Sequence, residues 1–551
     1  MTFKFFGGSK EQEMAPIIHG SHPSPVLQTH GLDDQQLSEG AEETERMTAI
    51  SLDPESTPGN QKTFWQKILP VMACGAGLFS DGYINNVISS VITVLGRQYG
   101  DVYKHSLASK HLGDVAFAGT VVGQLVFGYL SDKWSRTNSL MLSTGILILF
   151  TALCTGSYWH GDAVGMFNIL AAWRFFVGIG VGGEYPAGSV SAAESTGELK
   201  SGTRNTWFIL FTNSMIDWGF VIGAFVPFVV AAATKNLEAI WRVSLGVGVV
   251  FPSLLFVLRI FLKEPEEYRK NSMKYAKIPY RLVLRFYGWR LFIVSAVWFI
   301  YDFSAYSFSI YSTTILASIF DNNTAPLTTI FGWNIVINLF YIPGTMLGAP
   351  VSDRLGPRNT LILGVTLQAV VGFLMAGCYP MLSKPGLVGP FAVVFGIFQA
   401  LGELGPGNNI GLMAAKTCAT GVRGQYYGIA AAIGKVGAFV GTLVFPYIIA
   451  ATGDDTNLSA QVPFYISSAL CLFSAVIVWL NLPVIHQDTI QIEDELFRQF
   501  LRDNKYDVRQ LGLKKSDETS SMRTSTTAVT ASPTTEPLQE KQSHEGEKVR
   551  V

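Results

Sequence analysis

The chain of 551 residues is apolar for its length, with 48% hydrophobic residues, 15% charged residues and a mean hydropathy of +0.30. This composition excludes an ordinary soluble protein of this size and favours an integral membrane protein. The formal net charge of −1 says nothing about partners, because the charges are segregated along the chain. We expect no nucleic-acid partner.

The chain begins with a polar segment, residues 1–64, that carries many acidic side chains. It contains no apolar run typical of a signal peptide, and it has too few apolar residues to fold alone. We therefore predict a disordered N-terminal tail.

Twelve apolar segments follow, each long enough for a helix to cross the roughly 30 Å of hydrocarbon in a bilayer. Open strands would leave backbone groups unpaired in lipid, so we expect helices. The segments lie near residues 69–96, 112–131, 139–159, 164–190, 204–233, 240–262, 290–319, 329–352, 360–380, 386–410, 424–451 and 463–483.

The distribution of basic residues predicts the topology. Lys and Arg concentrate in the loops on one side of the predicted spans, above all in the polar central loop, residues 263–289. Basic loops stay in the cytoplasm, which places both termini there. We expect a multi-pass protein of the plasma membrane with six-helix bundles over 65–262 and 290–485. Residues 486–551 should form a mostly disordered cytoplasmic tail.

Two similar loops occupy matching positions in the two halves. Gly128-Tyr129-Leu130-Ser131-Asp132-Lys133-Trp134-Ser135-Arg136 and Pro350-Val351-Ser352-Asp353-Arg354-Leu355-Gly356-Pro357-Arg358 each separate two apolar segments. Such a repeat indicates two pseudo-symmetric bundles. It resembles the major facilitator superfamily, an all-α membrane fold of twelve transmembrane helices. We expect Asp132, Arg136, Asp353 and Arg358 to hold helix ends together and to release them during transport.

Ionisable residues within the spans are costly and need a function. Five are acids and two are bases, so the acids cannot all be ionised in a dry cavity, and protonatable acids are what proton-coupled transport requires. The residues are Asp81, Arg174, Glu184, Asp217, Asp302, Glu403 and Lys435. Arg174 resembles the superfamily's fourth-helix arginine and is expected to meet an acid such as Asp81; the alternative is a static structural pair.

Three motifs resemble the phosphate:proton symporter family, which includes fungal glycerophosphodiester permeases. They are the Gly-rich segment from Gly178 to Pro186, which contains Glu184-Tyr185-Pro186, the Trp298, Asp302, Tyr306 series at four-residue spacing, and the Gly434-Lys435 segment. The spacing of the second motif places all three side chains on one helix face. The resemblance implies a substrate site formed by Tyr185, Trp298, Asp302, Tyr306 and Lys435. It also implies proton transfer through Asp81, Glu184 and Asp302.

Two positions depart from the phosphate symporters. Ile216, which is followed by Asp217, stands where that family has a phosphate-binding glutamine. Gly407, which is followed by Asn408, alters the family's Gly-Pro-Asn ligand segment. We interpret the exchange as a larger and less polar cavity that suits a phosphodiester with an organic substituent. The resemblance therefore implies a proton-coupled importer of glycerophosphoinositol or glycerophosphocholine.

Two alternatives remain at this stage: an inorganic phosphate:proton symporter, and a transporter-shaped nutrient receptor that carries no flux. No nucleophile–base pair or metal-ligand spacing indicates an enzyme. The expected partners are an anionic phosphodiester or phosphate, protons and the lipid bilayer. We expect no metal and no cofactor, with the proton gradient as the energy source.

Overall fold

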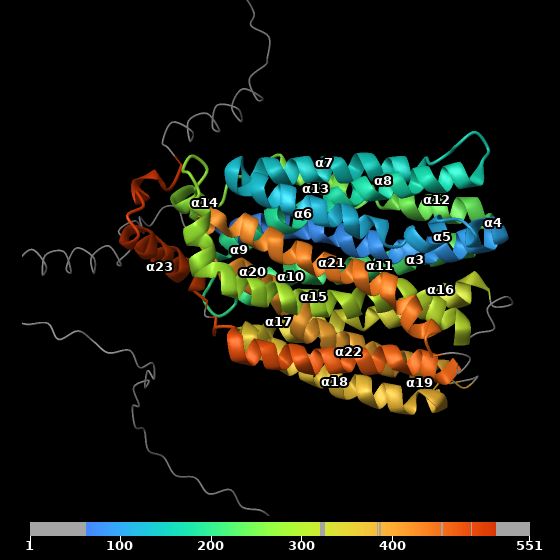
Figure 1. The fold of residues 1–551 in the computed structure, drawn as a ribbon. Coiled ribbons are helices and arrows are strands. Elements are labelled where there is room, and N and C mark those ends of the chain that lie inside the picture. Colours follow the sequence, from blue (N-terminus) through green and yellow to red (C-terminus); the bar gives the residue numbers. More distant parts are fainter. Residues whose placement is uncertain are drawn as a thin grey trace, which may run out of the picture. The chain divides into compact units, whose positions relative to one another are not determined.

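The computed structural model describes residues 62–319, 326–382, 384, 387–452, 456–485 and 487–513, and these residues form helices and connecting turns without any strand. The predicted disorder of residues 1–61 and 514–551 lies outside this described part. Long helices run side by side, and two short helices, α14 (Glu266–Asn271) and α23 (Thr489–Asp503), lie together at one end (Figure 1).

The first half of the chain contains the elements up to the central loop. They are α2 (Phe64–Gly75), η1 (Ala76–Leu78), α3 (Phe79–Tyr99), α4 (Asp101–Lys104), α5 (Ala108–His111), α6 (Val115–Lys133), α7 (Arg136–Thr155), α8 (Ala163–Gly183), η2 (Glu184–Ser189), α9 (Val190–Ser195), η3 (Thr196–Glu198), α10 (Arg204–Phe211), α11 (Asn213–Ala233), α12 (Leu237–Val247) and α13 (Val250–Arg259).

The second half follows α14 with a similar order of elements. They are α15 (Tyr280–Ile319), α16 (Leu327–Leu339), α17 (Tyr341–Leu355), α18 (Pro357–Leu382), α19 (Val388–Gly402), η4 (Glu403–Gly407), α20 (Asn408–Lys416), η5 (Thr420–Val422), α21 (Arg423–Ala450), α22 (Thr456–Asn481), α23 and η6 (Val508–Gln510).

Eleven helical stretches of the described residues are long and apolar enough to cross a membrane. The remaining predicted span, 69–96, is helical as well, as α2, η1 and α3. Its apolar character is reduced by polar side chains such as Asp81, Asn85 and Asn86, all of which are buried. The first span is therefore an inner helix that carries polar groups into the protein instead of facing lipid.

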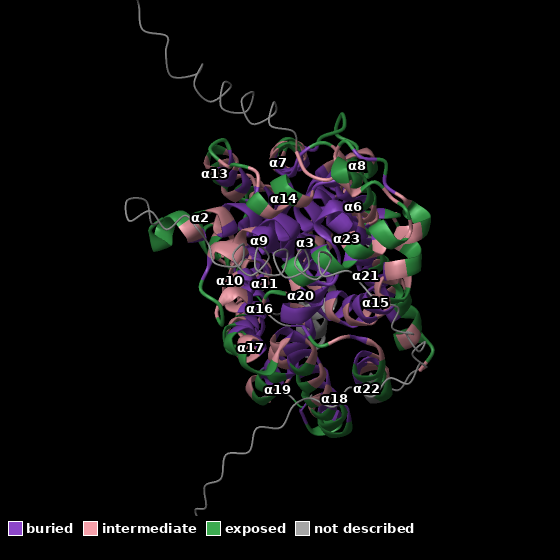
Figure 2. Ribbon diagram, turned by 90° about the vertical axis from the view of Figure 1, so that its left-hand side faces the viewer, coloured by how far each residue is buried: buried purple, intermediate pink, exposed green. Residues whose placement is uncertain are grey.

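Burial follows the position of each helix in the bundle. Helices α3, α6 and α21 lie among mostly buried residues, whereas exposed residues concentrate on outer helices such as α18 and α22 (Figure 2). Many exposed side chains are large and apolar, including Phe261, Trp479 and Leu480. Such an apolar exterior suits contact with lipid chains.

The glycines of the fourth span allow two helices to touch through their backbones. A Cβ atom on Gly178 would lie 2.0 Å from the Ala116 carbonyl oxygen, and one on Gly119 would lie 1.9 Å from that of Phe175. Small residues at four-residue spacing permit this approach in membrane helices. The Gly-rich segment is thus a packing surface between α6 and α8.

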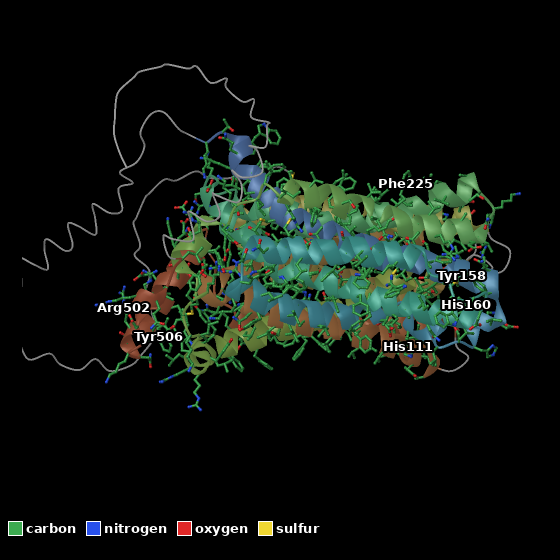
Figure 3. All side chains as sticks on the ribbon, turned by 90° about the horizontal axis from the view of Figure 1, so that it is seen from above. His111, Tyr158, His160, Phe225, Arg502 and Tyr506 are labelled. Atoms are coloured by element: carbon green, nitrogen blue, oxygen red, sulfur yellow. The ribbon has the colours of Figure 1, made fainter. Side chains whose placement is uncertain are left out.

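The two ends of the bundle differ in the chain segments that they carry. Tyr158 and His160 mark one end, and Arg502 and Tyr506 mark the other (Figure 3). We call the second the α14/α23 end. Because α23 is a formed helix packed through Phe497 and Leu501, the segment after residue 485 is more ordered near the bundle than the sequence indicated.

Candidate functional site

Two π-helical turns position the residues of the site. One, η2, contains Glu184 and Tyr185, and the other, η4, runs from Glu403 to Gly407; each begins with glutamate and contains a proline. They occupy corresponding spans of the two halves. A π-helical turn widens a helix and redirects its side chains, often at a functional site.

Lys435 is held between two carboxylates that come from different halves of the chain. Its Nζ lies 3.5 Å from Asp81 Oδ2 and 3.4 Å from Asp302 Oδ2, and its side chain is almost fully buried. The ammonium group also lies 3.6 Å from the centre of the Tyr306 ring. With both acids ionised, this group of three carries one net negative charge.

Two tyrosines connect the halves at the same point. The hydroxyls of Tyr185 and Tyr306 each donate a hydrogen bond of 2.7 Å to Asp81 Oδ2, and Asn85 donates one of 2.8 Å to the other oxygen. Trp298 packs beside them, with its ring centre 6.3 Å from that of Tyr185. The structure therefore brings together all five predicted substrate-binding residues and Asp81.

A cavity of about 660 Å³, open solvent included, borders this cluster. Tyr185, Trp298, Asp302 and Tyr306 line it, as do the predicted specificity positions Ile216, Gly407 and Asn408. Its walls also include Asn213, Tyr301, Tyr341 and Glu403. Both halves of the chain contribute, as expected for a site that opens alternately to either side of the membrane.

The wall near Gly407 is more polar than the sequence suggested. A Cβ atom on Gly407 would lie 2.0 Å from Glu403 Oε2 and 3.1 Å from the Tyr301 hydroxyl. The glycine therefore makes room for the Glu403 carboxylate instead of enlarging the cavity. Our interpretation of Gly407 as a source of a less polar cavity was wrong.

We expect Gly407→Ala to lower transport because the added methyl group overlaps the Glu403 carboxylate and crowds this wall of the cavity. The loss in kcat/KM should be about tenfold or more, since an overpacked core costs roughly 1–3 kcal/mol. Uptake kinetics corrected for protein at the membrane would measure it. Ile216→Ala, at another lining position, should have a smaller effect, and equal losses would contradict this role of Gly407.

Two predicted roles are changed by the structure. Arg174 does not meet Asp81. Its Nε donates a hydrogen bond of 2.9 Å to the Leu112 carbonyl oxygen, near the end of the bundle opposite α14 and α23. Its position on α8 lies far from Asn85 and Tyr185, which bind Asp81. Glu184 forms a two-point ion pair with Arg259, with both distances 2.7 Å. Arg259 was missed as this partner: it lies near the end of the predicted span 240–262, and its position in the sequence does not show which acid it meets.

The predicted gate residues Asp132 and Asp353 each bind the first turn of a helix in the opposite half. Asp132 accepts from the backbone N–H groups of Gly424 and Gln425, both at 2.9 Å, at the start of α21. Asp353 accepts from Asn205 at 3.1 Å and Thr206 at 2.9 Å, at the start of α10. A carboxylate satisfies the free N–H groups and the positive end of the helix dipole.

A buried ionic network completes this contact at the α14/α23 end. Arg136 pairs with Asp132 at 2.6 Å and with Glu194 at 3.0 Å, and Arg423 of the second half pairs with Glu194 at 3.0 Å. Arg358 does not take part, since its guanidinium donates to the Trp479 carbonyl oxygen within its own half. The two predicted gate loops therefore make matching contacts through their acids but different contacts through their arginines.

Asp132→Asn and Asp353→Asn should each slow transport more than they change affinity. Each removes one carboxylate that ties the halves, so kcat should fall about tenfold while KM changes by less than about threefold. Initial uptake rates over a range of substrate concentrations would separate the two constants. Glu238→Gln, which alters an exposed ion pair with Arg242, is the control, and a change in KM alone would show that these residues are not gates.

Comparison with known proteins agrees with this architecture. Residues 69–268 and 263–497 match the sugar (and other) transporter family. A glycerophosphocholine permease from Candida albicans is 49% identical over 456 residues, 82% of this chain and 84% of the relative. A major glycerophosphoinositol permease from the same organism is 50% identical over 450 residues, 80% of this chain and 83% of the relative.

A solved structure supports the fold. A proton:xylose symporter bound to 6-bromo-6-deoxy-D-glucose superposes with a TM-score of 0.64 at 17% identity, covering 78% of this chain and 98% of the symporter. The helical bundle and its central cavity thus define a membrane transporter of the major facilitator superfamily and not an enzyme. Within it, the chain belongs to the sugar (and other) transporter family, in the branch of fungal glycerophosphodiester permeases. The predicted fold class and branch are confirmed.

Proposed function

We propose that this protein imports glycerophosphodiesters together with protons across the plasma membrane by alternating access. The observation that carries the proposal is the position of Lys435 between Asp81 and Asp302, one acid from each half, beside the central cavity. The names of the two Candida relatives support the substrate class.

Charge balance explains how a proton and an anion would be bound together. The Lys435 cluster already has one surplus negative charge when both acids are ionised, so a phosphodiester anion would be repelled. Protonation of one acid leaves the cluster neutral and frees the ammonium group to bind a phosphoryl oxygen. Substrate and proton then favour each other's binding, as linkage requires.

Asp302 is the better candidate for the proton. Asp81 accepts three hydrogen bonds besides its contact with Lys435, which stabilise its charged form. At Asp302 the carboxylate interacts with Trp298, and its Oδ2 has only the Lys435 ammonium at 3.4 Å, without a hydrogen bond from the described residues. Glu184 is neutralised by Arg259 and is therefore a structural element of the site in this conformation.

The concentration of Lys and Arg in the loops supports a cytoplasmic location for the α14/α23 end. The contacts of Asp132 and Asp353 would then close the cytoplasmic side. Breaking them would allow the halves to rock apart and expose the cavity to the cytoplasm.

The test is uptake of labelled glycerophosphocholine in cells that lack other diester transporters, with unlabelled glycerophosphoinositol or inorganic phosphate as competitor. We expect saturable uptake that either diester inhibits more strongly than phosphate. Efficient phosphate uptake with neither diester carried would favour a phosphate:proton symporter instead. Absence of any flux despite binding would favour a receptor.

A further inference from the structure

The two glutamates that begin the π-helical turns have different surroundings. Glu184 is paired with Arg259, but Glu403 forms no ion pair with a Lys or Arg of the described residues, although it is only 6% exposed. Glu403 lines the cavity that holds Asp302. A carboxylate kept without a basic partner in a buried wall is costly unless a ligand compensates it.

The hydrogen-bonding capacity of Glu403 is already used within the protein. Tyr301 donates to its Oε1 at 2.8 Å, and Asn213 donates to its Oε2 at 2.8 Å. When Glu403 is ionised, its negative charge therefore has no basic partner among the described residues, although its hydrogen bonds are complete, and a bound cation would favour that ionised form.

A second acid reinforces this end of the cavity. Asp217, fully buried on α11, accepts a hydrogen bond from Thr345 at Oδ2, while its Oδ1 has no hydrogen-bond partner among the described residues. Asn213 contacts both Glu403, at 2.8 Å, and Thr345, at 3.5 Å, and so connects the two acids across the halves.

Aromatic rings line the same part of the cavity. Phe220, Tyr301 and Tyr341 contribute to its wall, and the Phe220 and Tyr341 ring centres are 5.2 Å apart. Aromatic faces together with a carboxylate favour a cation that cannot donate hydrogen bonds, such as a quaternary ammonium group. An inositol ring would instead need partners for several hydroxyls, and the donors here are already used: Tyr301 and Asn213 donate to Glu403, and Tyr341 donates to Gln399.

We propose that Glu403, with the buried Asp217 connected to it through Asn213 and Thr345, forms a cation subsite that binds the trimethylammonium head of a zwitterionic diester while the Lys435 end binds its phosphoryl group. This inference rests on the proposed function and specifies its substrate: glycerophosphocholine is preferred over glycerophosphoinositol. The chain is 49% identical to the relative named for glycerophosphocholine and 50% identical to the one named for glycerophosphoinositol, so sequence identity does not decide between the two substrates.

The test compares uptake of labelled glycerophosphocholine and glycerophosphoinositol by the wild type, Glu403→Gln and Asp217→Asn. We expect Glu403→Gln to raise KM for glycerophosphocholine about tenfold and KM for glycerophosphoinositol less than about threefold. Asp217→Asn should act in the same direction more weakly. Glu238→Gln, at an exposed pair remote from the cavity lining, is the matched charge-removing control.

Glycerophosphoinositol uptake reports whether each variant folds and reaches the membrane. Equal losses for both diesters, or no change for glycerophosphocholine, would overturn the cation subsite while leaving diester transport intact. The wild type provides an independent test: a lower KM for glycerophosphoinositol than for glycerophosphocholine would also overturn the cation subsite. Failure of the wild type to carry either diester would refute the proposed function itself.

Discussion

Replacing Asp302 with asparagine should abolish the accumulation of substrate against its gradient and leave the protein in the membrane. An amide keeps the size of the side chain and its contact with Lys435, but it cannot take up and release a proton. We expect concentrative uptake driven by a pH gradient to fall by about 100-fold or more, in the range found when a proton-transfer group is removed. Uptake by wild type and variant across a series of external pH values would measure this.

Exchange of labelled for unlabelled substrate provides the control for this variant. Exchange requires binding and rocking of the halves without net proton movement, so Asp302→Asn should retain it. A variant that still concentrates substrate with the wild-type pH dependence would show that another acid, such as Asp81, carries the proton. Loss of exchange together with accumulation would assign Asp302 to substrate binding alone.

Lys435→Ala should weaken substrate binding by about 100-fold, because it removes the cation that a buried phosphoryl group needs. It also leaves Asp81 and Asp302 facing the cavity without their shared partner, since both lie within 3.5 Å of the ammonium group. Lys435→Arg should give a smaller defect, because it keeps the charge but not the compact shape. Equilibrium binding of labelled glycerophosphocholine to purified protein would rank the three.

Adding Asp302→Asn to Lys435→Ala separates the two causes of this loss. If repulsion by the unpaired acids contributes, the double variant should bind better than Lys435→Ala alone. Equal affinity in the wild type and Lys435→Ala would remove Lys435 from the site.

Residues of the central cavity could be predicted from the sequence where they lie on one helix at regular spacing. Trp298, Asp302 and Tyr306 share a face by spacing alone, and the structure places Asp302 and Tyr306 against Lys435. The loop repeat likewise pointed to Asp132 and Asp353, and each carboxylate accepts from the first turn of a helix in the other half. Their role as gates stays a prediction.

Pairings between helices could not be obtained from the sequence. Spacing does not show which acid a buried arginine meets, and the expected Arg174–Asp81 contact was replaced by Lys435–Asp81. The partner of Glu184, Arg259, lies near the end of the predicted span 240–262, and its position there does not show which acid it meets. Gly407 was misread for the same reason, because the space beside a glycine is known only when its neighbour, here Glu403, is located.

The role of proton coupling is tested most directly in liposomes that contain only the purified protein. Addition of glycerophosphocholine to vesicles without a pre-formed pH gradient should acidify the interior, as reported by a trapped pH-sensitive dye, and a protonophore should abolish the signal. This acidification should be saturable in glycerophosphocholine and absent in Asp302→Asn. Entry of labelled glycerophosphocholine without any change in internal pH would contradict it.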